Sequence, residues 1–441
     1  MCIMNSTNGI QQVVSDLKAS PLFSLSLSSK ELFHSNFLAW LGNNDRTKQF
    51  FVEVINELVK DLNLQSTGNW IVEREDHHFD LCINEINKKG KKGKYLLIIE
   101  NKVKSIPIKK QLDEYETETV NGKGSHTKYL LLTLTEKFAH RTKIENNPWI
   151  VKTYQDLANI MRNKQGSISD PYLQSLLKDY IEFIENLDAL VRDWQNETDF
   201  APKWEDIPKL KDLHAKIQFS RYCEKLKTEI LSKLNDIVVY DDDDIPADAD
   251  IDSSKVYVKV YWGYASRGQD GILDVEIPVT CFDNPKIVMG LDNNKGIPRV
   301  PFNIKIQVQG HSYRHVLETN TMFDNNTVGD VLIKIGKSSL YTDSSQFNYF
   351  SIEPKQNPSM PNYINDNIFY NDDNKHRRLY PVNKGDKQNQ IPGSRWPFAS
   401  YKDKGILQFI YQYRIIKDNI SIDQVLDNIV KEVERILDYF T

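Results

Sequence analysis

The sequence has few features of membrane or secreted proteins. Its 441 residues contain no apolar run near the roughly 20 residues that span a bilayer, and the longest are Tyr95–Ile99 and Tyr129–Leu132. The first residues, Met1–Gly9, lack a basic segment followed by an apolar one, so we expect no secretory signal. Cysteine is also scarce and scattered, at positions 2, 82, 223 and 281. This spacing argues against disulfide frameworks, zinc ribbons and cysteine-ligated iron–sulfur clusters, and predicts a reducing, cytoplasmic setting.

Positive charge is not in excess either. Lysine and arginine together number 56 against 61 acidic residues, so the formal net charge is -5. A strongly basic chain would indicate a nucleic-acid or membrane partner. Any nucleic-acid site in this chain must therefore concentrate positive charge locally.

The length predicts more than one domain, because a single core rarely grows beyond roughly 250–300 residues. We expect a first domain over residues 1–195 and a helical connector with an acidic linker over residues 196–252. Seven aspartates between Asp241 and Asp252 mark that linker. Residues 253–441 are expected to form a β-rich domain that serves recognition, regulation or oligomerisation.

The periodicity of apolar residues in the first domain predicts an α/β (α+β) fold with a mixed central sheet flanked by helices. Helical spacing is found over residues 10–62, 107–119, 171–194 and 205–236. Strand patterns are found over residues 70–75, 79–84, 95–99, 129–134 and 149–154. In the second half, strand patterns occupy residues 256–260, 272–280, 302–309, 331–335 and 407–415, and a final helix is expected over residues 422–440.

Chemistry is concentrated where two of these strands meet. Glu100 and Lys102 end an apolar strand and point to the same side of it, and a hairpin places Asp80 beside them. Polar groups at the end of a buried strand are costly without partners. Two carboxylates with the main-chain carbonyl of Asn101 are ligands that Mg²⁺ prefers, and Mn²⁺ should substitute. Lys102 would orient or help to deprotonate an attacking water.

A lysine-rich turn supplies local positive charge. We expect nucleic-acid contacts from these lysines: Lys88, Lys89, Lys91, Lys92, Lys94 and Lys104. The alternative is a solubilising hairpin tip. A second basic cluster, residues 375–378, lies among aromatic residues, and it predicts a site only weakly.

These residues resemble the motif of the PD-(D/E)XK nuclease superfamily: Phe79-Asp80-Leu81, then Ile98-Ile-Glu-Asn-Lys102, then Gln111-Leu-Asp-Glu-Tyr115. The last element is similar to the QxxxY motif of the RecB-like branch, and the segment Glu31–Leu41 to the opening helix of a bacterial subfamily. The resemblance implies that Gln111 supports the metal site and that Tyr115 contacts nucleic acid. It also implies a role for the acidic Glu75.

The resemblance implies a Mg²⁺-dependent deoxyribonuclease that leaves a 5′-phosphate, with DNA favoured over RNA and a role in defence against foreign DNA. The alternatives are a catalytically silent nucleic-acid-binding or sensor protein and a structure-specific or modification-dependent endonuclease. Homo-oligomerisation is left open.

Several residues also have plain structural explanations. Tyr115 fits core packing, Glu75 competes with Glu73, and His77 and His78 fit an exposed turn. Glu31 and His34 fit a structural pair or a helix cap.

Overall fold

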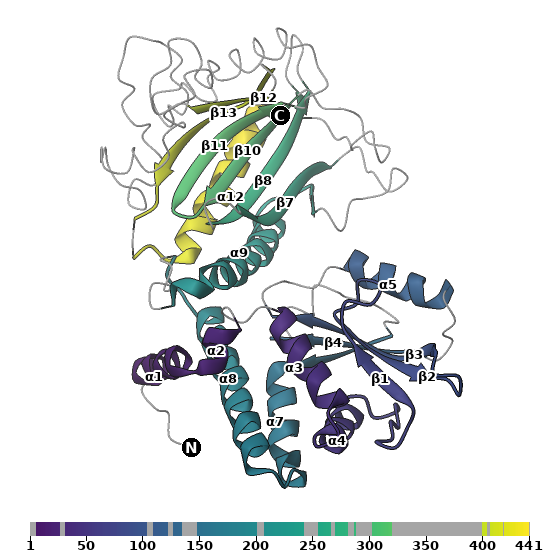
Figure 1. The fold of residues 1–441 in the computed structure, drawn as a ribbon. Helices are drawn as coiled ribbons and strands as arrows, with labels where there is room; N and C mark the ends of the chain where they lie inside the picture. Colours follow the sequence, from purple (N-terminus) through teal and green to yellow (C-terminus); the bar gives the residue numbers. More distant parts are fainter. Residues whose placement is uncertain are drawn as a thin grey trace. The chain divides into compact units, whose positions relative to one another are not determined.

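The computed structural model divides the chain into two compact units (Figure 1). Unit 1 comprises Met1–Asn196 and Lys203–Ile217, and unit 2 comprises Glu197–Pro202 and Gln218–Thr441. The structure describes residues 6–26, 31–103, 109–121, 127–134, 148–200, 207–241, 255–265, 270–280, 286–287, 302–319, 399–403, 406–417 and 419–440. Every helix in these ranges is too short or too polar to cross a lipid bilayer.

Unit 1 begins with helices, as the apolar spacing predicts. They are α1 (Ser6–Ala19), α2 (Pro21–Leu25), α3 (Glu31–Asn43) and α4 (Lys48–Leu58). The later helices are α5 (Lys109–Asn121), α7 (Tyr154–Lys164) and α8 (Pro171–Gln195), with short 3-10 turns η1 (Gln165–Ser167) and η3 (Pro208–Leu210). Asp170 caps α8 by accepting hydrogen bonds from the N–H groups of Tyr172 and Leu173, and Pro171 occupies the first turn, where no donor is needed.

A five-stranded mixed sheet forms the centre of unit 1. Its strands follow chain order: β1 (Trp70–Glu73), β2 (Leu81–Ile86), β3 (Lys92–Lys102), β4 (Lys128–Thr133) and β5 (Trp149–Thr153). The first three strands pair antiparallel, whereas β3 with β4 and β4 with β5 pair parallel. Helix α5 makes the crossover that a parallel pair requires. The predicted mixed sheet flanked by helices is confirmed.

Helix α7 was not predicted, because the strand pattern runs directly into it. Thr153 is the last residue of β5 and also the N-cap of α7. Its side chain accepts a hydrogen bond from the N–H of Asp156, and the carboxylate of Asp156 accepts one from the N–H of Thr153. This capping box turns strand into helix without the glycine or proline that marks most boundaries.

The two faces of this sheet are buried in different layers (Figure 1). Leu97 and Ile99 of β3 point into a large apolar layer shared with helices α3, α4, α7 and α8. Ile98 points to the other face, where Leu112 and Tyr115 of α5 cover it. Because side chains alternate along a strand, Glu100 and Lys102 continue the α5 face and Asn101 continues the other face.

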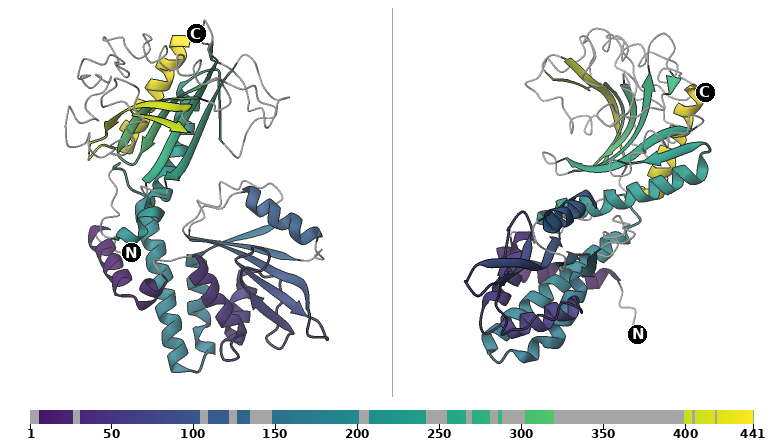
Figure 2. Two further views of the ribbon diagram at one scale, coloured as in Figure 1. Left: turned by 45° about the horizontal axis from the view of Figure 1, so that its top comes forward. Right: turned by 90° about the vertical axis from the view of Figure 1, so that its right-hand side faces the viewer.

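Unit 2 is built on a curved eight-stranded sheet (Figure 2). The strand order is β12-β13-β11-β10-β8-β7-β6, with β9 paired to β8. The bounds are β6 (Ile237–Tyr240), β7 (Val256–Ala265), β8 (Asp270–Thr280), β9 (Lys286–Ile287), β10 (Phe302–Gln309), β11 (Ser312–Thr319), β12 (Ala399–Asp403) and β13 (Ile406–Ile415). Only β6 and β7 pair parallel among these described strands.

Two helices, α9 (Lys211–Lys233) and α12 (Ile422–Phe440), bury their apolar stripes against one face of this sheet. The β-rich second half and its terminal helix are confirmed, and α12 has the predicted bounds. Strands β6, β11 and β12 were not predicted. The predicted strand at residues 331–335 and the basic cluster at residues 375–378 lie outside the described residues.

Candidate active site

Asp80 lies where the pairing of β2 with β3 ends. The last paired residues are Leu81 and Ile99, so Asp80 is placed opposite Glu100, one residue before β2 begins. At this point the N–H of Asn101 donates to the side chain of Asp80, at Oδ2 and 2.8 Å, and not to the main chain of a neighbouring strand. The N–H and C=O of one strand residue point to the same side. The carbonyl of Asn101 therefore faces the side where Asp80 lies.

Glu100 and Lys102 form a buried ion pair that Gln111 of α5 completes. Lys102 Nζ lies 2.7 Å from Glu100 Oε1 and donates to Gln111 Oε1 at 3.0 Å. The amide of Gln111 donates in turn to Glu100 Oε1 at 3.1 Å. The other carboxylate oxygen, Glu100 Oε2, is buried and has no hydrogen-bond partner within the described residues. The structure thus brings together Asp80, Glu100, Lys102 and Gln111.

Burial makes negative charge costly at this site. It raises the pKa of Glu100 to about 8, with Lys102 opposing the shift and the charge of Asp80 adding to it. Burial also raises the pKa of Asp80, against the lowering effect of the Asn101 N–H and of Lys102. Burial opposes the charged form of Lys102, but Glu100 outweighs it, and the pKa of Lys102 is raised. Because two desolvated carboxyl groups lie beside a single cation, a second cation at this site would stabilise their charged forms.

Tyr115 connects α5 to the turn that carries Asp80. Its hydroxyl accepts a hydrogen bond from Gln111 Nε2 at 2.6 Å and donates to the carbonyl of His78 at 3.2 Å. Its ring packs edge-on against Phe79, with the centroids 5.2 Å apart. Tyr115 is only 7% exposed, so in this structure it links parts of the site, and its expected contact with nucleic acid stays a prediction.

The turn before Asp80 is strained. Glu75, His77 and His78 all have positive φ angles, 52°, 52° and 72°. A non-glycine residue in such a conformation costs about 1–3 kcal/mol and is found most often at functional sites. The side chains of Glu75, His77 and His78 are exposed. Among the described residues, no hydrogen bond or ion pair joins Glu75 to Asp80 or Glu100, so the structure does not bring it into the cluster.

A second acidic group lies on the other side of this turn. Ligand atoms of Glu73, Asp76 and Cys82 lie within 4.8 Å of one another, close enough for a metal ion. However, Lys92 Nζ already lies 2.8 Å from Glu73 Oε1 and 3.7 Å from Asp76 Oδ2. Asp76 also accepts a hydrogen bond from the Tyr95 hydroxyl at 3.3 Å. Lysine supplies the positive charge here, and the group serves to anchor the turn.

Two residues of α3, Glu31 and Ser35, lie near the site, although the sequence pattern offered a plain structural explanation for Glu31 and did not single out Ser35. Glu31 is half-buried, accepts a hydrogen bond from the N–H of Val103 at 3.2 Å, and raises the pKa of both Asp80 and Glu100. Ser35, one turn later, accepts a hydrogen bond from the Asn101 side chain. The similarity of Glu31–Leu41 to an opening nuclease helix was the only sequence signal for them. His34, in contrast, is a buried structural partner of Tyr180, 3.0 Å from its hydroxyl.

The predicted phosphate-binding lysines behave differently from one another. Lys88, Lys89, Lys91 and Lys94 are exposed on the β2–β3 hairpin. The Asn87 side chain shapes this turn by accepting hydrogen bonds from the N–H groups of Lys89 and Lys91, and Gly90 takes the positive φ of 72°. Lys92 is held by its two carboxylates, and Lys104 lies outside the described residues.

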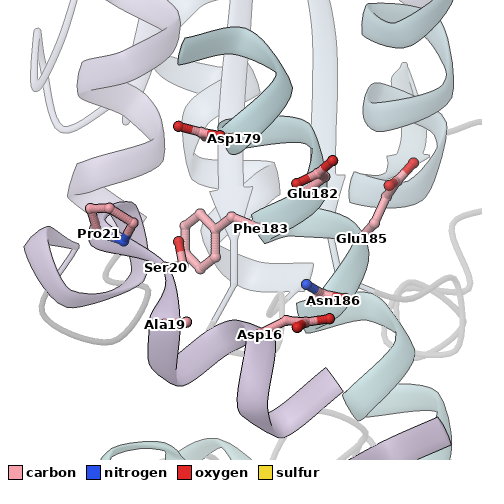
Figure 3. Close-up of a pocket in the computed structure, with 9 residues that line it drawn as sticks. All are labelled: Asp16, Ala19, Ser20, Pro21, Asp179, Glu182, Phe183, Glu185 and Asn186. Carbon is pink, nitrogen blue, oxygen red and sulfur yellow. The ribbon is translucent and has the colours of Figure 1, made fainter. Parts of the chain in front are cut away.

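A hollow of about 480 Å³ between helices α1, α2 and α8 has four acids among its nine lining residues and no base (Figure 3). Its walls include Asp16, Asp179, Glu182 and Glu185, around the ring of Phe183. Carboxylates repel phosphate groups, so this hollow does not suit a nucleic-acid backbone.

A comparison with protein-family models finds one match, the PD-(D/E)XK nuclease superfamily, over residues 22–182. The match runs from α2 into α8 and contains the whole cluster of Asp80, Glu100 and Lys102. No curated protein and no solved structure matches the chain. The resemblance inferred from the motif residues is therefore confirmed for this part of the chain.

Proposed function

We propose that the protein is a metal-dependent deoxyribonuclease, because residues 22–182 match the model of the PD-(D/E)XK nuclease superfamily, whose members cleave phosphodiester bonds. The observation that carries the proposal is the convergence of Asp80, Glu100 and Lys102 where β3 ends, with Gln111 bridging the last two. The RecB-like branch is the best match for the Gln111 and Tyr115 spacing.

The donors at this site fit Mg²⁺ or Mn²⁺. The carboxylates of Asp80 and Glu100 and the carbonyl of Asn101 are hard oxygen ligands. Glu100 Oε2 is a buried acceptor that receives no hydrogen bond from the described residues, as expected of an atom that binds a cation. A bound divalent ion would neutralise charge on the scissile phosphate and lower the pKa of a water ligand.

The protein's own groups would do the remaining work. Lys102 is held by Glu100 and Gln111, and its raised pKa keeps it a cation. An ammonium in this place can orient the attacking water and stabilise negative charge that develops on the phosphate. Glu31 adds a third carboxylate near the site, which accepts the N–H of Val103 and would add to the negative charge that favours a bound cation.

The substrate proposed is DNA, on family grounds. The exposed lysines of the β2–β3 hairpin offer phosphate contacts at the end of these two strands that lies opposite to the site. Defence against foreign DNA and a recognition or regulatory role for unit 2 are parts of the same proposal.

The test is metal-dependent cleavage by the purified full chain. Wild type, Lys102→Ala and Glu100→Gln are incubated with supercoiled, linear, single-stranded and branched DNA, with Mg²⁺ or Mn²⁺ and with EDTA. Exposed Lys60→Ala serves as the matched lysine control. We expect cleavage by wild type and the control alone, abolished by EDTA.

Equal behaviour of wild type and Lys102→Ala would remove the catalytic claim. Binding without cleavage would instead support a silent nuclease fold, and cleavage restricted to branched DNA a structure-specific endonuclease.

A further inference from the structure

A short chain of buried polar groups lies behind the candidate active site, on the opposite face of β3. The side-chain amide of Asn101 donates to Ser35 Oγ at 2.6 Å, and the Tyr154 hydroxyl donates to Asn101 Oδ1 at 3.3 Å. Ser35 belongs to α3, and Tyr154 is the first residue of α7. None of the three residues is more than 1% exposed.

These groups interrupt a layer that is otherwise apolar. Leu97 and Ile99 of the same strand, and Val103 directly after it, lie in the large core of unit 1 together with residues of α3 and α7. Polar atoms in such a layer are costly unless they are paired, whereas a leucine at position 101 would simply fill space. Burial raises the pKa of Tyr154, so its hydroxyl stays protonated and able to donate. The arrangement is satisfied, but packing alone does not require it.

Asn101 is the residue that connects these buried polar groups to the candidate active site. It separates Glu100 from Lys102, and its N–H holds Asp80 Oδ2 at 2.8 Å. Its carbonyl faces the same side. Helices α3 and α7 hold the Asn101 side chain and therefore also hold the main chain around it. Glu100 projects from this segment, and Asp80 is hydrogen-bonded to it.

We propose that Ser35, Asn101 and Tyr154 are positioning residues, which hold the end of β3 in the geometry that binds the divalent metal. This inference rests on the proposed function. It assigns to α3 and α7 a part in metal affinity. Tyr154 acts through the Asn101 side chain, and Ser35 acts through the same side chain while its Oγ also donates to the main-chain carbonyl of Glu31 at 3.3 Å.

A purely structural role makes a different prediction, and the chain offers a matched control. Tyr180→Phe also removes one buried hydroxyl. That hydroxyl is hydrogen-bonded to His34 and not to Asn101. If the hydrogen bonds serve only stability, Tyr154→Phe and Tyr180→Phe lower the melting temperature alike and change nothing else.

The test compares Ser35→Ala, Tyr154→Phe, their double variant and Tyr180→Phe in the full chain. Three quantities are measured: Mn²⁺ binding by calorimetry, the Mn²⁺ concentration for half-maximal cleavage, and thermal unfolding. Residues that support metal ligands typically change affinity about 10–100-fold when replaced. We expect the double variant to weaken Mn²⁺ binding by about tenfold or more, with Tyr180→Phe binding as wild type does. Each single variant removes one hydroxyl and keeps the test usable if the double variant does not fold.

Wild-type Mn²⁺ affinity in both single variants would overturn the inference, provided that Asp80→Asn loses Mn²⁺ binding. Failure of wild type itself to bind Mn²⁺ or cleave DNA would overturn the proposed function, which is a separate result.

Discussion

Each of the two units buries a pair of carboxylates with a lysine on its sheet, yet only one group fits a metal site. In unit 2, Lys305 of β10 lies 2.5 Å from Glu276 Oε1 and 3.9 Å from Asp274 Oδ2, both on β8. The hydroxyl of Tyr261 donates to Glu276 at 2.6 Å. By composition this group resembles Asp80, Glu100 and Lys102 closely.

The difference lies in where the residues stand on their strands. Glu276 and Lys305 are directly paired in the middle of β8 and β10, and each strand has a neighbour on both sides. Their N–H and C=O groups are therefore used in the ladder. Asp80 stands just outside the β2–β3 ladder, where the main chain of Asn101 faces it. Two acids and a lysine become a candidate metal site only where a strand pair ends.

The largest expected effect separates the two lysines. Lys102→Met should lower the cleavage rate by about 10²–10³-fold, the range for loss of a group that stabilises developing negative charge. Lys305→Met should instead destabilise unit 2 by about 3–5 kcal/mol, because two buried carboxylates lose their cation. DNA cleavage and urea unfolding measure the two effects. Unchanged cleavage in Lys102→Met, with a loss of stability like that of Lys305→Met, would show that the two groups are the same kind of structural ion pair.

The next effect is a pH dependence of unit 2. Burial raises the pKa of Asp274 from 3.8 to about 6, with Lys305 opposing and Glu276 adding to the shift. Between these values the folded protein binds the proton more tightly than the unfolded chain. The free energy of unfolding should therefore fall as pH rises, by about 1.4 kcal/mol per unit. Urea unfolding from pH 4 to pH 6 should show this slope in wild type and less of it in Asp274→Asn. Identical slopes would contradict the assignment.

A smaller effect tests the link through Tyr115. Tyr115→Phe breaks the connection between Gln111 and the His78 carbonyl and should slow cleavage about tenfold, as loss of a supporting hydrogen bond does. Tyr261→Phe removes a comparable hydroxyl in unit 2 and should cost about 1 kcal/mol of stability with no change in cleavage. Unchanged cleavage in Tyr115→Phe would show that Tyr115 contributes only to core packing.

The smallest effect concerns the hairpin lysines. Each phosphate contact contributes about 0.9 to the slope of log affinity against log salt concentration. Lys88→Ala with Lys89→Ala should lower that slope by nearly two contacts, whereas Lys18→Ala with Lys60→Ala, equally exposed, should not. Fluorescence anisotropy with a labelled duplex, in Ca²⁺ to prevent cleavage, measures both. If the hairpin double variant has the same salt slope as wild type, the hairpin lysines serve only solubility.

Much of the fold could be predicted from local patterns. The helices α3, α4, α8 and α12 and the strands β2, β3 and β4 follow the spacing of apolar residues, which reports burial on one face. The strand β11, which escaped prediction, has mixed faces. In β11, Tyr313 and His315 enter the core while Arg314 faces a polar side, so the alternation of hydrophobicity is weak.

The sequence by itself determined the chemistry of the candidate site. Strand alternation placed Glu100 and Lys102 on one face, a hairpin brought Asp80 to them, and helical spacing put Gln111 and Tyr115 on one side of α5. These relations depend on neighbours along the chain and on single strand pairs, and so they can be read from residue order.

Only the tertiary structure decided what holds that chemistry in place. The partner of the Asn101 side-chain NH₂ group is 66 residues away in α3, and the hydroxyl that donates to Asn101 Oδ1 is 53 residues away in α7. Such pairs exist only when helices pack on the reverse face of β3, and no local pattern encodes which polar atoms then meet. The same packing distinguishes the strand end that carries Asp80 from the middle of β8, where like residues form an internal ion pair.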